Sequence, residues 1–323
     1  MSIVAIGPVA NLPSWDWVGI DTINELSKYY QVEVFNSFHC LPGASVIVVV
    51  KKMPPTNFMQ QACDNHKNVI FMPIDYFAGE EQIQSCASIL GQCKLVISHA
   101  DSLIPHFRKY APTYPIEHTS KYALLNTVSY KPEGFILWVG GYQFTPYILR
   151  WLRDHPLGNK IVFCTDYKNE RAIAKAEEIA TYFKVSFNAL QQFEMHEWSE
   201  STQAQLMSDA KAAIDIKGND FSQRHKPPTK GQQFVASGIP FAVNKGNNCY
   251  DYFQSRGFDV CTPEELHRWL SEAYAQQTRE FGRKLRLRIH AQAVGIQMKK
   301  YIDAVMPKDS KSCTTIGLSI HHN

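Results

Sequence analysis

Basic side chains are concentrated in one short segment, which follows a strand-like run ending at Ile216 and leads into a helical pattern starting at residues 228–229. The cations of this segment are Lys217, Arg224, His225, Lys226 and Lys230. A helix N-terminus attracts anions through its unpaired N–H groups and its dipole, and neighbouring cations strengthen that attraction. The segment therefore predicts a site for a phosphate or diphosphate, with Thr229 at the helix start. A solvated basic loop is the alternative interpretation.

Groups that can accept a proton follow two strand-like runs in the first half of the sequence. Asp75 and His99 each come directly after such a run. A carboxylate or an imidazole can act there as a general base, and the pKa of histidine is the better match to neutral pH. We predict Asp75 and His99 as catalytic bases, with His118 as a third candidate. The alternative is a local role, such as the helix N-cap for which Asp101 is suited.

The sequence has no motif typical of a metal site. It contains no Asp-x-Asp pair, and its eight cysteines form neither a Cys-x-x-Cys pair nor a zinc-binding spacing with histidine. Cations and helix N–H groups can stabilise a leaving diphosphate in place of a metal. We therefore predict chemistry without a metal or other cofactor. Free thiols favour a reducing compartment, which here predicts a cytoplasmic protein.

The composition is that of a globular protein with two domains. The chain has 323 residues, of which 45% are hydrophobic and 20% charged, and these values exclude a disordered protein. A formal net charge of +3 is too small for a dedicated nucleic-acid binder. The sequence opens without a basic leader, and its most apolar run, 44–50, is shorter than a membrane span. We expect a soluble protein that does not bind nucleic acid.

Short runs rich in valine and isoleucine alternate with helical patterns, which predicts parallel sheets built from βαβ units. In the first half the predicted strands are 3–7, 32–35, 45–50, 69–73, 95–98 and 114–117. After a polar stretch the pattern restarts, with predicted strands at 135–140, 160–164, 185–187, 212–216 and 240–243. The expected fold class is α/β, with two Rossmann-like, doubly wound parallel-sheet domains facing across a cleft. Such sheets bind ligands at the carboxyl ends of their strands, so we expect the site in that cleft.

Helical patterns lie between and after these strands. The predicted helices are 16–30, 102–110, 147–154, 169–183, 199–210, 229–237, 250–256, 263–274 and 278–305. We predict an N-terminal domain over residues 1–128, a second domain over 129–277, the long helix 278–305 and a flexible tail over 306–323.

Two segments resemble the donor-binding domain of GT-B glycosyltransferases of the retaining group 1 type. Lys226-Pro-Pro-Thr-Lys230, followed by Gln233-Phe-Val-Ala-Ser-Gly-Ile-Pro240, is similar to the loop, helix and Glu-Ala-x-Ala-x-Gly-x-Pro pattern of that family. Phe135-Ile-Leu-Trp-Val-Gly-Gly141 is similar to its first strand and glycine turn. The resemblance implies that the second domain binds a nucleotide-diphosphate sugar, that the first binds the acceptor, and that the last helix crosses back to the first domain.

The sequence departs from the family pattern at two places. Gln233 stands where many retaining members have the Glu that holds the donor ribose, and Tyr142-Gln-Phe144 stands where they have the Arg and Lys that hold the diphosphate. The resemblance therefore implies that other cations compensate, namely Lys226 and Lys230 together with Arg224 or Lys217.

The resemblance also implies which residues surround the rest of the donor. Gly141 and Tyr142 are expected beside the diphosphate, because glycine permits close approach of the backbone. Phe193, His196 and Trp198 are expected near the nucleotide base. A position in the core is the alternative for Trp198.

Together these features predict a metal-independent glycosyltransferase with a saccharide or lipid-linked acceptor. The last predicted helix is rich in cations, at Arg279, Arg283, Lys284, Arg286 and Arg288, and such a helix can contact the inner face of a membrane. A solvated helix face is the alternative. A nucleotide-sugar epimerase and a non-enzymatic nucleotide- or sugar-binding module are the rival functions, and the sequence leaves retention or inversion at the sugar open.

Overall fold

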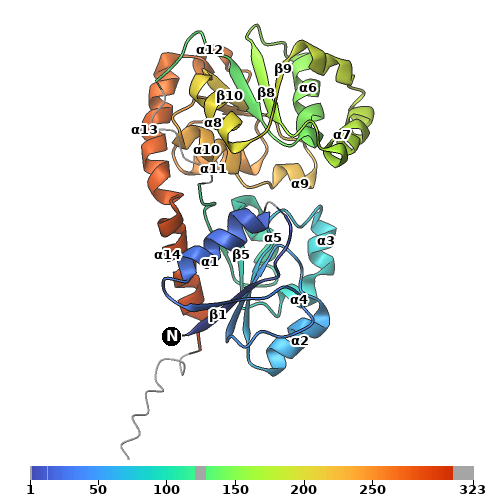
Figure 1. Ribbon diagram of the computed structural model, residues 1–323, viewed down its shortest axis with the longest axis vertical. Coiled ribbons are helices and arrows are strands. Elements are labelled where there is room, and N and C mark those ends of the chain that lie inside the picture. Colours follow the sequence, from blue (N-terminus) through green and yellow to red (C-terminus); the bar gives the residue numbers. More distant parts are fainter. Residues whose placement is uncertain (1, 13, 121–128, 308–323) are drawn as a thin grey trace, which may run out of the picture.

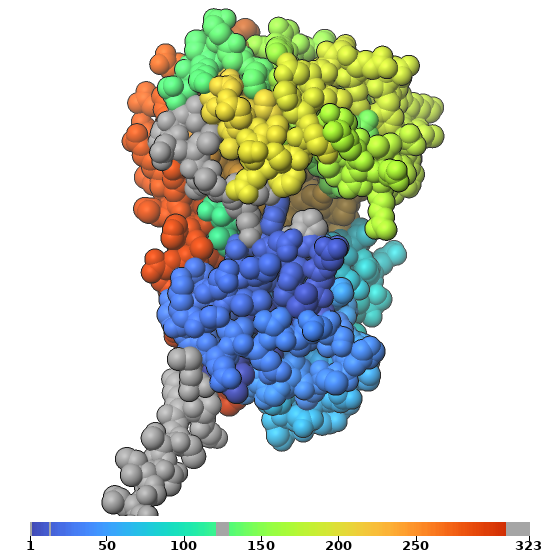
Figure 2. Space-filling view, in the orientation of Figure 1, coloured from blue at the N-terminus to red at the C-terminus, as the bar shows by residue number. Residues whose placement is uncertain are grey.

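The computed structural model describes residues 2–12, 14–120 and 129–307. Figure 1 shows two α/β domains stacked along the long axis, with helices α13 (Glu272–Arg288) and α14 (Ala291–Val305) along one side of both. Figure 2 shows the domains as two lobes that meet at a waist. The predicted fold class of two parallel-sheet α/β domains is confirmed.

The first domain contains a six-stranded parallel sheet with the strand order β2-β1-β3-β4-β5-β6. All five residues of the central strand β3 are buried, as expected for a parallel sheet with both faces covered. The strands are β1 (Ile3–Gly7), β2 (Gln31–Val34), β3 (Val46–Val50), β4 (Asn68–Met72), β5 (Leu95–Ser98) and β6 (Thr113–Pro115).

The helices of the first domain are shorter than the sequence predicts. The predicted helix 16–30 ends at Leu26, and the predicted helix 102–110 ends at Phe107. The observed elements are η1 (Trp15–Ile20), α1 (Asp21–Leu26), α2 (Thr56–Asp64), α3 (Glu80–Ser85), α4 (Ala87–Leu90), η2 (Asp101–Leu103) and α5 (Ile104–Phe107).

The second domain contains a five-stranded parallel sheet with the order β11-β10-β7-β8-β9. Its strands are β7 (Ile136–Val139), β8 (Ile161–Thr165), β9 (Glu194–Glu197), β10 (Ala212–Asp215) and β11 (Phe241–Val243). The prediction of a strand at 185–187 was wrong, because that region leads into the 3₁₀ helix η4 (Phe187–Gln192). The true edge strand β9 has the polar sequence Glu-Met-His-Glu and carries no run of valine or isoleucine.

The remaining helices of the second domain cover its sheet and link its strands. They are η3 (Tyr142–Phe144), α6 (Thr145–Asp154), α7 (Glu170–Phe183), α8 (Glu200–Asp209), α9 (Phe221–Arg224), α10 (Thr229–Ala236), α11 (Asn248–Ser255) and α12 (Leu266–Trp269).

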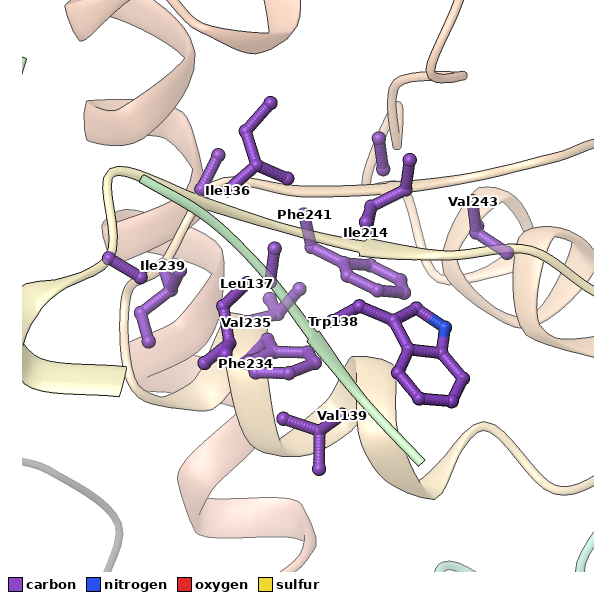
Figure 3. Close-up of a cluster of buried hydrophobic side chains, with 14 of the residues drawn as sticks. Ile136, Leu137, Trp138, Val139, Ile214, Phe234, Val235, Ile239, Phe241 and Val243 are labelled. Atoms are coloured by element: carbon purple, nitrogen blue, oxygen red, sulfur yellow. The ribbon is translucent and has the colours of Figure 1, made fainter. Parts of the chain in front are cut away.

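Helix α10 is fixed on the second sheet by close packing. Figure 3 shows Phe234 and Val235 of α10 among the apolar side chains of β7, β10 and β11. A Cβ atom at Gly231 would lie 2.8 Å from ring carbons of both Phe241 and Phe253, so only glycine fits there. This packing holds the N-terminus of α10 next to the carboxyl end of β10.

The predicted helix 278–305 is two helices, α13 and α14, and α13 already begins at Glu272. The predicted helix 263–274 is likewise divided, into α12 and the first turn of α13, with a break at Leu270 and Ser271. The break falls at Ile289 and His290, where His290 leaves the helical conformation and its side chain accepts a hydrogen bond from the N–H of Gln292. Helix α13 packs on α10 and helix α14 packs on α1, so the chain does cross back to the first domain. The predicted domain boundary at 128/129 falls at the end of residues 121–128, which lie outside the described residues. Residues 308–323, which make up most of the predicted tail, also lie outside them.

Candidate functional site

A buried carboxylate at the end of β10 organises two of the predicted cations. The Asp215 side chain forms ion pairs with Lys217 (Nζ to Oδ2, 2.7 Å) and Lys230 (Nζ to Oδ1, 2.8 Å). Burial alone would raise the pKa of Asp215, but the two lysines outweigh it and hold that pKa at about 2. Asp215 is therefore ionised at neutral pH and fixes both ammonium groups at the carboxyl edge of the sheet.

Lys226 adds a third ammonium group that has no carboxylate within ion-pair distance among the described residues. Its Nζ lies 3.4 Å from the centroid of the Phe144 ring. Burial, followed by repulsion from Lys217, lowers the pKa of Lys226 to about 7. We call Lys217, Lys226 and Lys230 the lysine cluster.

The lysine cluster carries more positive charge than Asp215 compensates. The excess is about one charge when Lys226 is neutral and about two when it is protonated. Asp75 of the first domain favours the protonated forms of Lys217 and Lys226, which for Lys226 offsets only part of the lowering of its pKa by burial. The cluster is therefore open to the field of the opposite domain. A partly desolvated excess of positive charge beside the N-terminus of α10 is suited to bind an anion such as a diphosphate.

The glycine turn after β7 lies directly against the lysine cluster. Lys230 Nζ donates a hydrogen bond to the Val139 carbonyl at 3.0 Å, and a Cβ atom at Gly140 would lie 3.2 Å from that Nζ. The next residue, Gly141, leads into η3, where the N–H of Tyr142 donates to Asp166 Oδ1 at 2.6 Å. The N–H of Tyr142 is therefore not available to a diphosphate. The predicted contact with the diphosphate would come from the Tyr142 side chain or from Gly141.

Gln233 and Trp198, predicted near the ribose and the base, are joined by a residue that the sequence analysis missed. Gln203 of α8 accepts a hydrogen bond from Trp198 Nε1 at 2.8 Å and donates one to Gln233 Oε1 at 3.0 Å. Gln203 is buried, whereas Trp198 is 39% exposed, so Trp198 is not a core residue. A glutamine among the buried residues of α8 is the only sequence signal for this link.

The other two aromatic candidates do not join Trp198. Phe193 packs against Phe163, with ring centroids 5.1 Å apart, and contributes to the core. His196 pairs with Glu194 at 2.6 Å on the edge strand. Phe193 and His196 therefore have partners of their own, and of the three residues Trp198 remains the predicted contact for the nucleotide base.

The other predicted residues of the basic segment, Thr229, Arg224 and His225, lie at three different places. Thr229 is the first residue of α10 but does not cap it, since no side-chain hydrogen bond caps this helix. Arg224 is exposed at the end of α9. His225 Nδ1 lies 2.8 Å from Ser102 Oγ of the first domain, and burial, with repulsion from His106 and Arg224, lowers the pKa of His225 to about 4.

The candidate bases of the first domain differ in accessibility. Asp75 is exposed, with φ at +49°, and follows β4. His99 is only 8% exposed and packs against His118, with ring centroids 4.3 Å apart. Burial, together with His118, lowers the pKa of His99 well below its usual value, so its imidazole is neutral at pH 7. Asp101 does not cap a helix as predicted, because its carboxylate pairs with Arg256 at 2.7 Å.

A cavity of about 450 Å³ lies at the carboxyl ends of β1, β2 and β3. Phe38 forms an apolar wall, supported by Phe58 at 5.0 Å between ring centroids, and Asn36, Lys52 and Asn57 contribute polar groups. Strands β3 and β4 are neighbours, and adjacent strands lie about 4.8 Å apart. The cavity therefore lies along the same edge of the sheet as the segment after β4, which contains Asp75.

The remaining predictions concern metals and membranes. Within residues 2–12, 14–120 and 129–307, no group of three or more His, Cys, Asp or Glu side chains is arranged to hold a metal ion. No helix in these ranges is both long enough and apolar enough to cross a bilayer. Of the cations on α13, Arg286 donates to the Ala236 carbonyl and Arg288 pairs with Glu117 at 2.6 Å, so these two serve contacts within the protein.

Known proteins resemble this chain in structure and not in sequence. No family model matches the chain, and no curated protein matches it. The HepE protein of Anabaena in complex with UDP-glucose is 10% identical with a TM-score of 0.61, over 94% of this chain and 100% of that chain. Trehalose-6-phosphate synthase OtsA is 10% identical with a TM-score of 0.56, over 91% and 78% of the two chains.

A third structure, AviGT4, a glycosyltransferase involved in avilamycin A biosynthesis, is 13% identical with a TM-score of 0.52, over 94% of this chain and 98% of that chain. These neighbours are GT-B glycosyltransferases. The resemblance expected from the basic segment and the glycine turn is thus confirmed at the level of the fold, and this chain has the two-domain GT-B fold.

Proposed function

We propose that the protein is a glycosyltransferase that moves a sugar from a nucleoside-diphosphate donor to an acceptor hydroxyl. The observation that carries the proposal is the uncompensated positive charge of the lysine cluster beside the N-terminus of α10. The fold alone does not establish an activity, because one fold serves many functions. HepE, which has the same fold, is in complex with UDP-glucose, and this supports a donor of the same class.

The donor diphosphate would bind the lysine cluster. Lys226 is the cation with no carboxylate to satisfy it within the described residues, so it is best placed to pair with a phosphate oxygen. Lys217 and Lys230 are already held by ion pairs with Asp215, so they add positive charge to the site without a change of conformation. Trp198 and Gln233, held together by Gln203, would contact the nucleoside part of the donor.

The acceptor would bind the first domain, in the cavity at the ends of β1, β2 and β3. Phe38 can stack on the apolar face of a sugar ring, and the amides of Asn36 and Asn57 can hydrogen-bond its hydroxyl groups. We therefore propose a saccharide acceptor. A lipid-linked acceptor is the second possibility, because Arg283, Lys284 and Leu287 are exposed on α13; sedimentation with anionic vesicles tests it.

In the transfer step, the bond between the anomeric carbon and the diphosphate oxygen breaks, and the electron pair leaves on the diphosphate. The acceptor oxygen forms the new bond to that carbon and loses its proton to a base. The lysine cluster would stabilise the negative charge that develops on the diphosphate. Since these lysines can supply the stabilisation that a metal gives elsewhere, we propose a reaction without a metal or other cofactor.

Asp75 is our preferred base, because it is exposed at the edge of the first sheet and lies within electrostatic reach of Lys226. His99 is the alternative, since Nδ1 of its buried ring has no hydrogen-bond partner among the described residues. We also propose a cytoplasmic location, supported by the seven described cysteines, all of which are free thiols.

The experiment that tests the proposal is a panel of nucleoside-diphosphate sugars, screened by thermal shift and then by calorimetry. A donor at 100 times its Kd should stabilise the protein by about 2.7 kcal/mol. Release of nucleoside diphosphate that depends on an added saccharide would support transfer. Conversion of the donor with no acceptor would favour an epimerase, and failure of every donor to bind would contradict the proposal.

A further inference from the structure

One carboxylate on the chain that leaves the first sheet accepts hydrogen bonds from three helices of the other half of the protein. Glu117, two residues after β6, accepts from Gln232 of α10 (Nε2 to Oε2, 2.9 Å) and from the Tyr252 hydroxyl of α11 (2.7 Å). Its second oxygen, Oε1, lies 3.4 Å from Nε of Arg256, the C-cap residue of α11, and 2.6 Å from Arg288 Nη2 of α13. We call Glu117 and these four donors the Glu117 hub.

Most of the Glu117 hub is buried, and Arg288 is its exposed member. Glu117 is 9% exposed, Gln232 2% and Tyr252 3%. Arg256 stacks on the Tyr252 ring, 3.6 Å from its centroid, and also pairs with Asp101 at 2.7 Å. Arg256, whose side chain is 13% exposed, therefore bridges Glu117 and Asp101, whereas the side chain of Arg288 is 46% exposed. The hydrogen bonds of Glu117 with Gln232 and Tyr252 are shielded from water and are stronger there than at an exposed surface.

A second contact joins the first domain to the loop that carries Lys226. The N–H of Ser102 donates to Asn248 Oδ1 at 3.0 Å, and Asn248 Nδ2 donates to the Lys226 carbonyl at 3.0 Å. Asn248 belongs to α11, the helix that also contains Tyr252 and that ends just before Arg256. Helix α11 therefore links the loop after β5, which contains His99, to the lysine cluster.

These contacts connect the two sides of the proposed reaction. Gln232, held by Glu117, lies between Lys230 and Gln233 in the sequence of α10. On the first domain Glu117 adjoins His118, whose ring packs on His99. A shift of Glu117 relative to α10 would therefore change the distance between the first domain and the lysine cluster.

We propose that Glu117 is a positioning residue: it holds the two domains together and sets the place of α10 relative to the first domain. The consequence for turnover rests on the proposed function. The consequence for domain arrangement does not, because it follows from the hydrogen bonds alone. Removing the carboxylate leaves the buried Tyr252 hydroxyl without its acceptor and takes one partner each from Gln232 and Arg256, and this disfavours the observed arrangement of the two domains.

The test compares Glu117→Ala with Glu81→Ala, a control that removes an exposed glutamate from α3 of the same domain. Small-angle scattering should show a larger radius of gyration for Glu117→Ala only. Hydrogen exchange in α10 and α11 should become about tenfold faster, because these helices lose a buried partner. Tyr252→Phe, which removes one hydrogen bond to Glu117 and keeps the ring, should also speed hydrogen exchange in these helices. This variant replaces Glu117→Ala in the test if Glu117→Ala does not fold.

A donor identified by the panel separates positioning from a general loss of structure. Glu117→Ala should bind that donor within about threefold of the wild-type Kd, because the lysine cluster belongs to the second domain, whereas kcat should fall about tenfold or more. Unchanged scattering and exchange in both variants would overturn the proposal. If no donor binds the wild-type protein, the proposed function fails, but scattering and exchange still decide the role of Glu117.

Discussion

Lys226 gives the sharpest prediction, because its charge changes within an accessible pH range. The pKa of this lysine is lowered to about 7, mainly by burial, so the ammonium group is about 90% protonated at pH 6 and about 3% protonated at pH 8.5. If a diphosphate needs the protonated form, donor affinity should fall about 30-fold between these values, or about 2 kcal/mol. The sign follows from linkage: the bound anion favours the charged lysine, so binding takes up a proton and weakens as the pH rises.

The assay is calorimetry with a nucleoside-diphosphate sugar, whose phosphates do not titrate in this range. At pH 8 each donor should take up about 0.9 proton, measured from the dependence of the heat on buffer ionisation enthalpy. Three neighbouring groups do not mimic this effect, because the pKa of Asp215 is about 2, that of His225 about 4, and that of Lys217 is raised. Burial also lowers the pKa of Lys230, so a variant that changes Lys226 alone is needed to separate the two lysines.

Lys226→Arg is the matched control, since arginine stays charged at these pH values and can still stack on Phe144. Its donor affinity should change by less than about threefold from pH 6 to 8.5. Lys226→Met should bind weakly at both values. If the donor affinity of the wild-type protein changes with pH as little as that of Lys226→Arg, the assignment of the diphosphate to Lys226 is refuted.

Three further predictions concern the same cleft. Lys230→Ala should weaken donor binding about tenfold in calorimetry and lower the free energy of unfolding in urea by about 3 kcal/mol, because Asp215 keeps only one of its two ion pairs. Asp75→Asn should lower kcat about 10² to 10⁴ fold with donor Kd unchanged, and His99→Gln is the parallel test; near wild-type turnover in both would exclude both as essential bases. Turnover should survive a chelator, and loss of activity that magnesium or manganese restores would show that a metal takes part.

The pattern of strands and helices was predictable where local signals were strong. Buried parallel strands such as β3 and β10 have runs of apolar residues, and α7 follows Asn169, whose side chain accepts hydrogen bonds from the backbone as an N-cap. The polar edge strand β9 lacks such a run and was missed. The break between α13 and α14 was missed because neither proline nor glycine stands there, and contacts with both domains determine it.

The candidate site was predictable in its cations and not in their partners. The density of basic residues marked Lys217, Lys226 and Lys230, but Asp215, which holds two of them, looked like part of a buried strand. Glu117 and its donors are more than 100 residues apart in the sequence, so no local spacing reveals them. Contacts of this kind become visible only when the fold brings distant segments together.

The most direct test of the central claim is mass spectrometry of the products formed from a nucleoside-diphosphate sugar and a saccharide acceptor. The account predicts one new product, heavier than the acceptor by one glycosyl unit, together with an equal amount of nucleoside diphosphate. The same reaction with Lys226→Met should form that product much more slowly. A donor that binds at the lysine cluster but yields no glycosylated product with any saccharide or lipid-linked acceptor would contradict the assignment of a transferase.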